Sequence, residues 1–389
     1  MNLLGYTDRL SAGPGDAIRF MVSSEHPTYR ADLVRLIHGD LDPRGPGFKA
    51  EEIAAPFAGD YRGVVQPIPT GSCVVVPSDP RLAPAAGVTI QAWLMPTLRT
   101  GGRQAVFGRW SPAANAGYDL ALNAEGHLVF RVGDGASQVE RVTSGAALPL
   151  GAWSFVSATF DAASGRLAVD HYPIEGWPRD PAVARAERNT ALRRIGAAEA
   201  PLAMAASWKG DGDGPAAFAD HFNGKIDRPR LLGRALSEAE LARLAAGGSP
   251  GDIDGAVAIW DFAQDSSSAR VVDASPNGLH GRTINLPARA MTGANWTGDE
   301  MRAAARPAEY GAIQFHDDDL DDAGWASDFS FTVPEDLRSG VYAARLRAGD
   351  DEDFVPFIVR PRLGQANAPI AYLMPTFTYL AYADEHMPI

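Results

Sequence analysis

Two acidic segments carry the residue types best suited to metal chemistry. Residues 316–322 read HDDDLDD, and carboxylates so close together could hold a hard cation such as calcium, which prefers several oxygen ligands. Residues 211–214 read DGDG, but they lack the further ligands and the terminal Glu of an EF-hand loop. We therefore expect a solvated acidic loop at 316–322, with a cation site as the alternative, and a turn at 211–214.

Groups for nucleophilic catalysis are present only in part. Asp170, His171 and Asp227 are residue types of a catalytic triad, but no serine in a strained turn completes it, so we expect them at the surface or in turns. Cys73 stands in the apolar run CVVV, which favours a buried structural thiol over a nucleophile. The sequence also lacks a His-Glu-x-x-His pair, paired cysteine ligands, a Gly-x-Ser-x-Gly elbow and a phosphate loop. No complete catalytic site is visible.

Several tryptophans offer a different chemistry, the stacking of an aromatic ring on a sugar. A groove lined by Trp110, Trp153 or Trp208 could bind carbohydrate in this way. Trp93 and Trp153 lie within alternating strand patterns, so the sequence favours core positions for them. Trp208, which is followed by Lys209, is the better candidate for an exposed ring.

Composition decides which elements must position these groups. The chain has 389 residues, enough for two or three domains, and its 40 Gly and 29 Pro separate short β-branched and aromatic runs, which favours an all-β fold. A net charge of −13 without any Lys/Arg-rich stretch argues against a nucleic-acid partner. Charged residues interrupt the N-terminal MNLLGYTDRL and no window approaches 18 apolar residues, so we expect a cytoplasmic protein without a membrane partner.

Strand patterns fall into three groups along the chain. The first group comprises 17–22 and 31–36. The second comprises 88–96, 104–110, 117–122, 127–132, 151–160 and 166–170. The third comprises 329–334, 340–347 and 354–359. Residues 40–69 and most of 173–200 are expected to be loop or linker. One helix is predicted at 236–246, where Ser237 and Glu240 have the spacing of a capping box.

The simplest arrangement inserts the second group into a sandwich built by the other two. We predict a first sandwich part at 1–70, a jelly roll at 71–285, a second sandwich part at 286–363, and at 364–389 the truncated start of another domain. Residues 369–375 read as a buried strand, and a single strand cannot form a core, so we expect the natural chain to continue.

Specific phrases connect the chain to known families. The strand IQAW at 90–93 and the segment GKIDRPRLLGRALSEAEL at 224–241 resemble concanavalin A/LamG-like jelly rolls. The phrases GYTDR at 5–9, LPARAMTG at 286–293 and PTFTY at 375–379 extend the resemblance to the large, catalytic subunit of bacterial N,N-dimethylformamidase, of which this chain resembles the N-terminal half. The implied fold is a LamG-like jelly roll inserted into an immunoglobulin-like β-sandwich.

The resemblance also implies a function. Members of this family hydrolyse N,N-dimethylformamide or a similar small amide to amine and formate. They use an iron ion that two Tyr and one Glu hold. They also have a small partner subunit and form oligomers. The resemblance implies Tyr379 as the first choice of iron ligand in this chain and Tyr382 as the second. The alternative is that both tyrosines simply pack at a strand end. The Glu and most catalytic residues would lie outside this chain, so it should be inactive alone. The alternative is a non-enzymatic carbohydrate- or protein-binding LamG module.

Overall fold

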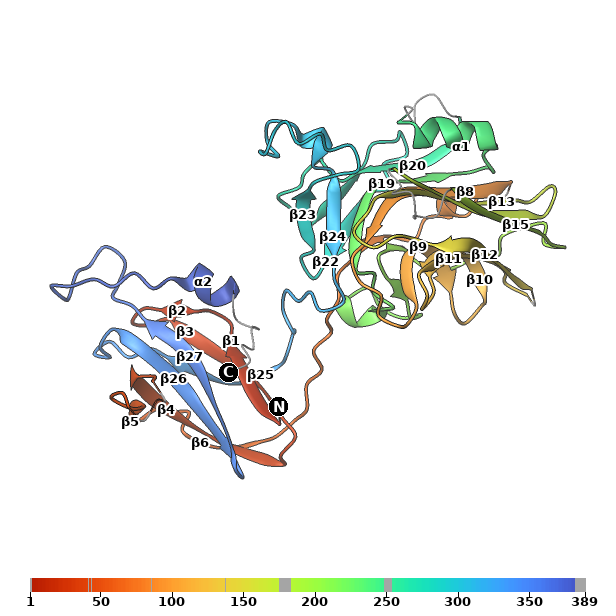
Figure 1. The fold of residues 1–389 in the computed structure, drawn as a ribbon. Coiled ribbons are helices and arrows are strands. Elements are labelled where there is room, and N and C mark those ends of the chain that lie inside the picture. Colours follow the sequence, from red (N-terminus) through yellow and green to blue (C-terminus); the bar gives the residue numbers. More distant parts are fainter. Residues whose placement is uncertain are drawn as a thin grey trace. The chain divides into compact units, whose positions relative to one another are not determined.

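A computed structural model describes residues 2–40, 42, 44–84, 86–136, 138–174, 183–247 and 254–381. The chain divides into two compact units (Figure 1). Unit 1 combines Met1–Ile68 with Gly324–Ile389, and unit 2 is the continuous segment Pro69–Ala323. Both units are built from strands, and no described helix is long and apolar enough to cross a membrane.

Unit 1 is an immunoglobulin-like sandwich of two sheets. The first sheet has the order β1 (Leu3–Thr7), β3 (Ala17–Ser24), β25 (Ser327–Thr332). The second has the order β2 (Ser11–Ala12), β27 (Asp351–Val359), β26 (Gly340–Ala348), β4 (Thr28–His38), β5 (Lys49–Ile53), and β6 (Gly59–Arg62) also pairs with β4. Each sheet therefore joins strands from both ends of the described chain.

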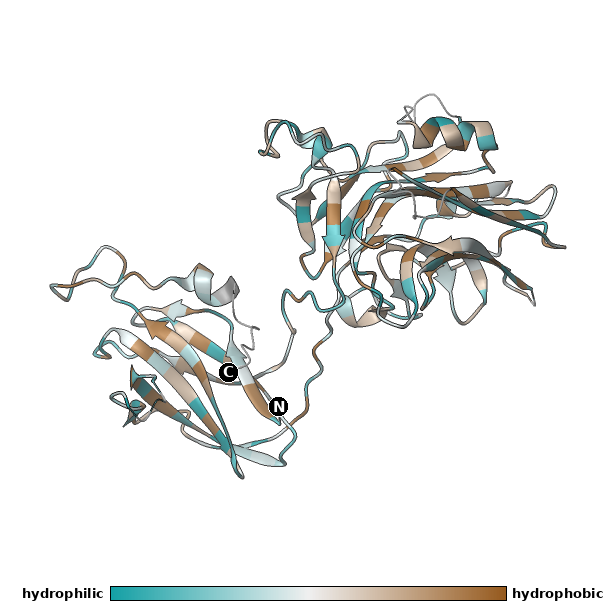
Figure 2. Ribbon diagram, viewed as in Figure 1, coloured by the Kyte–Doolittle hydropathy of each residue, from teal (hydrophilic) through white to brown (hydrophobic). Residues whose placement is uncertain are grey.

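The core of unit 1 explains why neither chain segment can form it alone. Phe20 of β3 stacks on Phe329 of β25 at 4.9 Å between ring centroids, and Phe57 stacks on the same ring at 5.0 Å. Apolar and polar residues alternate along these strands, so one face of each sheet is apolar (Figure 2). The expected loop at 40–69 is wrong in part, because β5 and β6 extend the sheet through β4.

The two connections to the inserted segment lie side by side. The amide of Ala326 donates to Oε1 of Gln66 at 2.8 Å, and Nε1 of Trp325 donates to the carbonyl of Pro67 at 2.7 Å. A chain that leaves and re-enters a sandwich at neighbouring points can carry an insertion without disturbing its core.

Unit 2 is a concanavalin A/LamG-like jelly roll. One layer follows the order β12 (Val139–Ala147), β11 (His127–Asp134), β10 (Ala116–Leu122), β9 (Gln104–Ser111), β16 (Leu202–Met204), β7 (Cys73–Val76), β22 (Gly281–Ile284), β21 (Arg270–Asp273). The other follows β20 (Ala256–Asp261), β19 (Gly224–Leu232), β8 (Gly87–Pro96), β13 (Ser154–Asp161), β14 (Arg166–Pro173), β15 (Ala184–Asn189). A short pair, β17 (Ser207–Trp208) and β18 (Phe218–Ala219), lies apart from these layers.

The inner faces of both layers form one apolar core. Trp260 is fully buried there, and its Nε1 donates to the carbonyl of Leu279 at 2.8 Å, so the ring is packed without leaving its polar atom unpaired. Cys73 is buried in a smaller cluster, and burial raises the pKa of its thiol to about 12, which fits the expected structural role.

Helix α1 (Glu238–Ala245) covers the outer face of the β8–β13 layer. The predicted capping box is confirmed, because Oγ of Ser237 accepts from the amide of Glu240 while the Glu240 carboxylate accepts from the amide of Ser237. Leu241 and Leu244 face the sheet and join a cluster that includes Trp93 and Phe155.

Unit 2 ends later than the sequence predicted. Beyond residue 285, β23 (Ala288–Met291) pairs with β24 (Ala312–Phe315), and β24 pairs with β19. Ile313 and Phe315 of β24 are fully buried in the jelly-roll core, so this hairpin-like segment belongs to unit 2 up to Ala323. The expected loop at 173–200 likewise contains the edge strand β15, whose polar residues hid its alternation.

The C-terminal segment of the described chain differs from its prediction. Residues 369–375 form no strand and are largely exposed, with Leu373 at 93%. A strand needs a partner to pair its backbone groups, and no described strand supplies one. A short helix, α2 (Thr376–Ala381), follows.

Candidate functional site

Of the two proposed iron ligands, the structure describes only Tyr379. Tyr379 lies on α2 and is 55% exposed, and Tyr382 lies outside the described residues. No group of three or more His, Cys, Asp or Glu side chains that could hold a metal ion occurs in the described part of the chain. One phenol oxygen is a hard donor suited to ferric iron, but alone it does not make a site.

The acidic segments behave as a loop and a turn. Asp319 accepts from Oγ of Ser72 at 2.5 Å and from the amide of His316 at 3.1 Å, so its carboxylate closes the loop. Asp318 and Asp321 point to solvent. In the other segment the carbonyl of Gly212 accepts from Nε1 of Trp208 at 2.9 Å. Residues 316–322 thus form a loop with mostly exposed side chains, as predicted.

The three residues that suggested a triad are not surface groups, and this prediction is wrong. Asp170, His171 and Asp227 are all buried. His171 lies opposite Val156, which belongs to the apolar core between the layers, whereas Asp170 lies near Arg185 and Asp227 contacts the loop between β23 and β24. Asp170 and His171 are consecutive in β14 and so face opposite sides of the sheet. Both ring nitrogens of His171 lack a partner, and burial lowers its pKa, so it forms no relay with Asp170.

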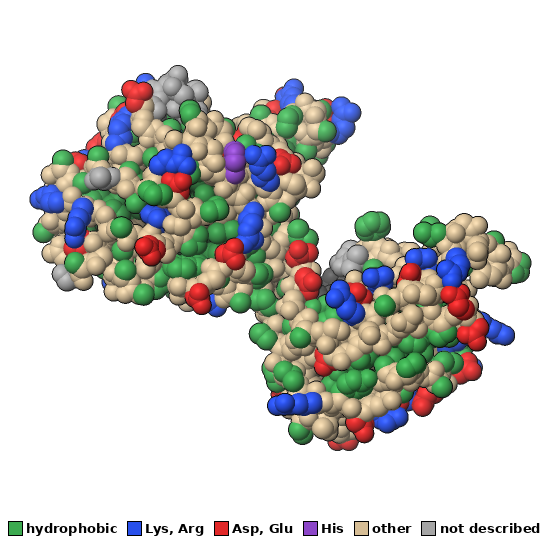
Figure 3. Space-filling model, turned by 180° about the vertical axis from the view of Figure 1, so that it is seen from behind, with side chains coloured by type: hydrophobic (Ala, Val, Ile, Leu, Met, Phe, Trp, Pro, Cys, Tyr) green, Lys and Arg blue, Asp and Glu red, His purple; other side chains and the backbone are tan. Residues whose placement is uncertain are grey.

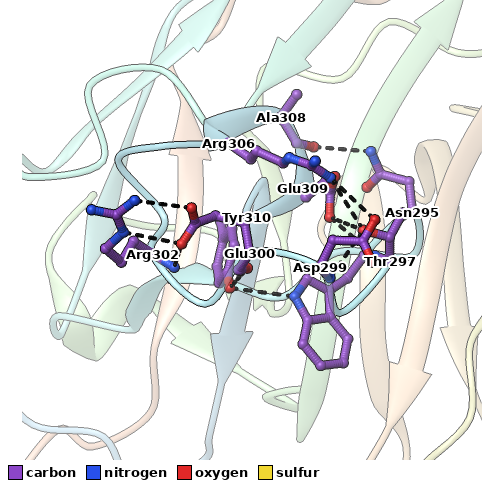
Figure 4. Close-up of polar contacts among 10 residues, drawn as sticks. Asn295, Thr297, Asp299, Glu300, Arg302, Arg306, Ala308, Glu309 and Tyr310 are labelled. Carbon is purple, nitrogen blue, oxygen red and sulfur yellow. Dashed lines mark hydrogen bonds and ion pairs between the residues drawn. The ribbon is translucent and has the colours of Figure 1, made fainter.

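Asp227 instead anchors the long loop between β23 and β24. Its Oδ2 accepts from the amide of Ala294 at 3.0 Å, and burial raises the pKa of this carboxyl. Figure 4 shows how the loop is held beyond this point: Glu309 accepts from both the amide and Oγ1 of Thr297 and pairs with Arg306 at 3.0 Å. The loop is therefore a structured arm rather than a loose connection.

A groove lies on the outer face of β9, β10 and β11. Two adjoining hollows of about 250 Å³ and 450 Å³ share Arg103, Trp110, Asp119 and Arg131, and Trp208 lines the first. Two of the three tryptophans proposed from the sequence are thus brought together. Trp153 is not, because it packs against the cluster beneath α1.

The floor of this groove is a fixed ionic network. Asp119 is buried and accepts from Nη2 of Arg103 and Nη2 of Arg131, each at 2.5 Å. Arg131 also lies over the ring of Trp110 at 3.9 Å from its centroid. Sequence reasoning missed this network, although Asp119 and Arg131 become direct neighbours once the β10–β11 register is known. Trp110 is buried beneath this cation, whereas Trp208 is half-buried, so Trp208 is the more accessible of the two rings.

Two family models match separate parts of the chain. Residues 70–242 match the concanavalin A-like lectin/glucanases superfamily, and residues 288–385 match a family described as N,N-dimethylformamidase beta subunit-like, C-terminal. Among solved structures, a putative carbohydrate binding protein from Bacteroides ovatus covers 73% of this chain and 91% of its own at 12% identity, with a TM-score of 0.38.

Two curated relatives are similar along essentially the whole chain. The N,N-dimethylformamidase beta subunit of Paracoccus aminophilus is 39% identical over 100% of this chain, and that of Alcaligenes sp is 36% identical over 98%. The alignments cover 53% and 52% of those proteins, so this chain spans about half the length of the relatives it matches. Their names call them beta subunits, which implies a multi-subunit enzyme.

Proposed function

We propose that this chain is the N-terminal scaffold half of the catalytic subunit of an iron-dependent amide hydrolase. The substrate is N,N-dimethylformamide or a similar small amide, and the products are the amine and formate. The observation that carries the proposal is the similarity of the entire chain to about half of each dimethylformamidase beta subunit.

Iron in the complete protein would supply a Lewis acid that polarises the amide carbonyl. Tyr379 and Tyr382 are the proposed iron ligands from this chain, and the Glu ligand would lie outside it.

Exposed apolar side chains support assembly with further protein. Leu363, Ile370, Tyr372, Leu373 and Phe377 are all strongly exposed around α2. On the face shown in Figure 3, apolar side chains also gather in a band on each unit, bordered by charged ones. Contiguous exposed apolar surface marks interaction sites. We propose that a small partner subunit, other copies of the chain or the rest of the subunit cover these surfaces in a cytoplasmic enzyme.

The test is dimethylamine release from dimethylformamide by the full-length protein co-expressed with its small subunit, with and without iron, beside this chain alone. We expect iron-dependent release by the complete protein only. Release by this chain alone would contradict the scaffold assignment, and no release by any preparation would contradict the substrate.

The iron ligand is tested by a matched pair of variants in the complete protein. Tyr379→Phe removes one phenol oxygen, whereas Tyr372→Phe makes the same change at an exposed site seven residues earlier. We expect Tyr379→Phe to lose bound iron and the visible tyrosinate-to-iron absorption, and Tyr372→Phe to keep both. Full iron content in both variants would remove Tyr379 from the ligand set.

A second candidate function is a non-enzymatic carbohydrate- or protein-binding module, and the groove with Trp110 and Trp208 favours it. Replacing 69–323 by a short Gly/Ser linker in the complete protein separates the two, because the connections at Gln66 and Ala326 are neighbours. Retained amide hydrolysis would make the jelly roll dispensable for catalysis. The deletion must run to 323, because β24 is buried in the jelly-roll core and would lose its partners if a shorter deletion left it behind.

A further inference from the structure

A buried arginine without a counter-ion lies on the sheet face beside helix α1. Arg230 of β19 is only 7% exposed, and its Nε has no hydrogen-bond partner. No carboxylate lies within ion-pair distance of it among the described residues. Arginine is almost never buried unless it is paired, because removing its charge from water is costly.

The carboxylate that acts electrostatically on Arg230 is already occupied. Asp227 accepts from Nε of Arg228 at 3.1 Å and from the amide of Ala294 at 3.0 Å. Burial and the neighbouring Arg228 lower the pKa of Arg230 to about 10, only partly opposed by Asp227. One carboxylate therefore serves two guanidinium groups, and one positive charge remains in excess.

Gln91 lies directly opposite Arg230 in the β8–β19 pairing, and its side chain also lacks hydrogen-bond partners. Gln91 is fully buried, and both its amide oxygen and its amide nitrogen lack partners. Leaving such groups dry costs about 1–3 kcal/mol each. The two residues thus present adjacent unused donors on one sheet face.

No acidic residue in the same row completes the pair. The register continues from Gln91 to Ser157 and then to Asp170, three strand spacings or about 14 Å of backbone from Arg230. Asp170 faces Arg185 instead, at 3.6 Å. Among the described residues, this row therefore supplies no free carboxylate to Arg230.

We propose that Arg230 and Gln91 form a binding site for a small monocarboxylate anion, of which formate and acetate are the simplest. A planar carboxylate accepts two parallel bonds from a guanidinium fork and can take a third from the Gln91 amide. It also supplies the single missing negative charge.

This site does not depend on the amide-hydrolase proposal, although formate is the acid product of that reaction. The experiment measures thermal unfolding of this chain rather than hydrolysis, so the two proposals fail separately. Sodium formate replaces sodium chloride at constant ionic strength and pH 7.5. We expect the unfolding temperature to rise saturably, by about 3–6 °C at ten times the dissociation constant.

Two variants of similar chemistry locate the site. Arg230→Met keeps the side-chain length without the charge, and it should unfold at the same temperature in both salts, and in chloride no lower than the natural protein. Arg282→Met removes an exposed arginine of the same unit that pairs with Asp213, and it should keep the formate response.

An unchanged unfolding temperature of the natural protein would mean that water alone satisfies these groups and would overturn the proposal. An equal response in Arg230→Met would overturn it as well. If Arg230→Met does not fold, broadening of the ¹³C-formate resonance by the natural protein, reversed by excess acetate, decides the question, and an unbroadened line rejects the site.

Discussion

The buried His171 should make the stability of unit 2 depend on pH in a defined direction. Its ring is fully buried beside Val156 and Ala184 of the adjacent strands, and both nitrogens lack partners. Burial, with a smaller effect of His127, lowers its pKa below the ordinary value near 6.5. The unfolded chain therefore binds this proton more readily than the folded chain does.

The sign and size of the effect follow from proton linkage. Above pH 6.5 the histidine is neutral in both states and contributes nothing. Between pH 6.5 and 5.5 the unfolded state gains the proton first, which lowers the free energy of unfolding by up to about 1 kcal/mol, and by up to about 1.4 kcal/mol for each further pH unit until the folded state also protonates.

Urea unfolding of the natural protein and of His171→Leu at several pH values isolates this contribution. Titration of the other buried groups, including Asp170 and Asp227, whose pKa values are raised, is common to both proteins and cancels in the difference. We expect the stability of the variant relative to the natural protein to be greater at pH 5.5 than at pH 7.5, by up to about 1.4 kcal/mol. Parallel curves for the two proteins would refute the reasoning.

Three further predictions concern local structure in unit 2. Ser237→Ala removes the capping box of α1 and should cost about 1 kcal/mol in urea unfolding, whereas Ser164→Ala, in an exposed turn, should cost less. Trp260→Ala should cost about 3–5 kcal/mol, because it empties the core and leaves the Leu279 carbonyl unpaired; a smaller loss would show that the core collapses around the gap. Cys73 should resist a thiol reagent in the folded protein and react on unfolding, and rapid native reaction would contradict its burial.

Local patterns were sufficient for much of the fold. Alternating strands, the capping box at Ser237 and the apolar run around Cys73 are signals carried by neighbouring residues, and each appears in the structure. The insertion of one sandwich into another could also be predicted, because strand groups at both ends of the chain needed partners. Short polar edge strands such as β5, β6 and β15 were missed, since they lack the apolar alternation on which strand prediction depends.

The tertiary structure decided what depends on strand register and burial. Whether Asp170 and His171 lie at the surface depends on what covers β14, which neighbouring residues do not specify. The ionic floor of the groove and the pairing of Arg230 with Gln91 join residues far apart in sequence through strand pairing. Long-range contacts of this kind are set by the packing of whole sheets. The sequence alone was therefore enough to predict the fold and to recognise the family resemblance. Only the tertiary structure showed which charged groups are left without partners.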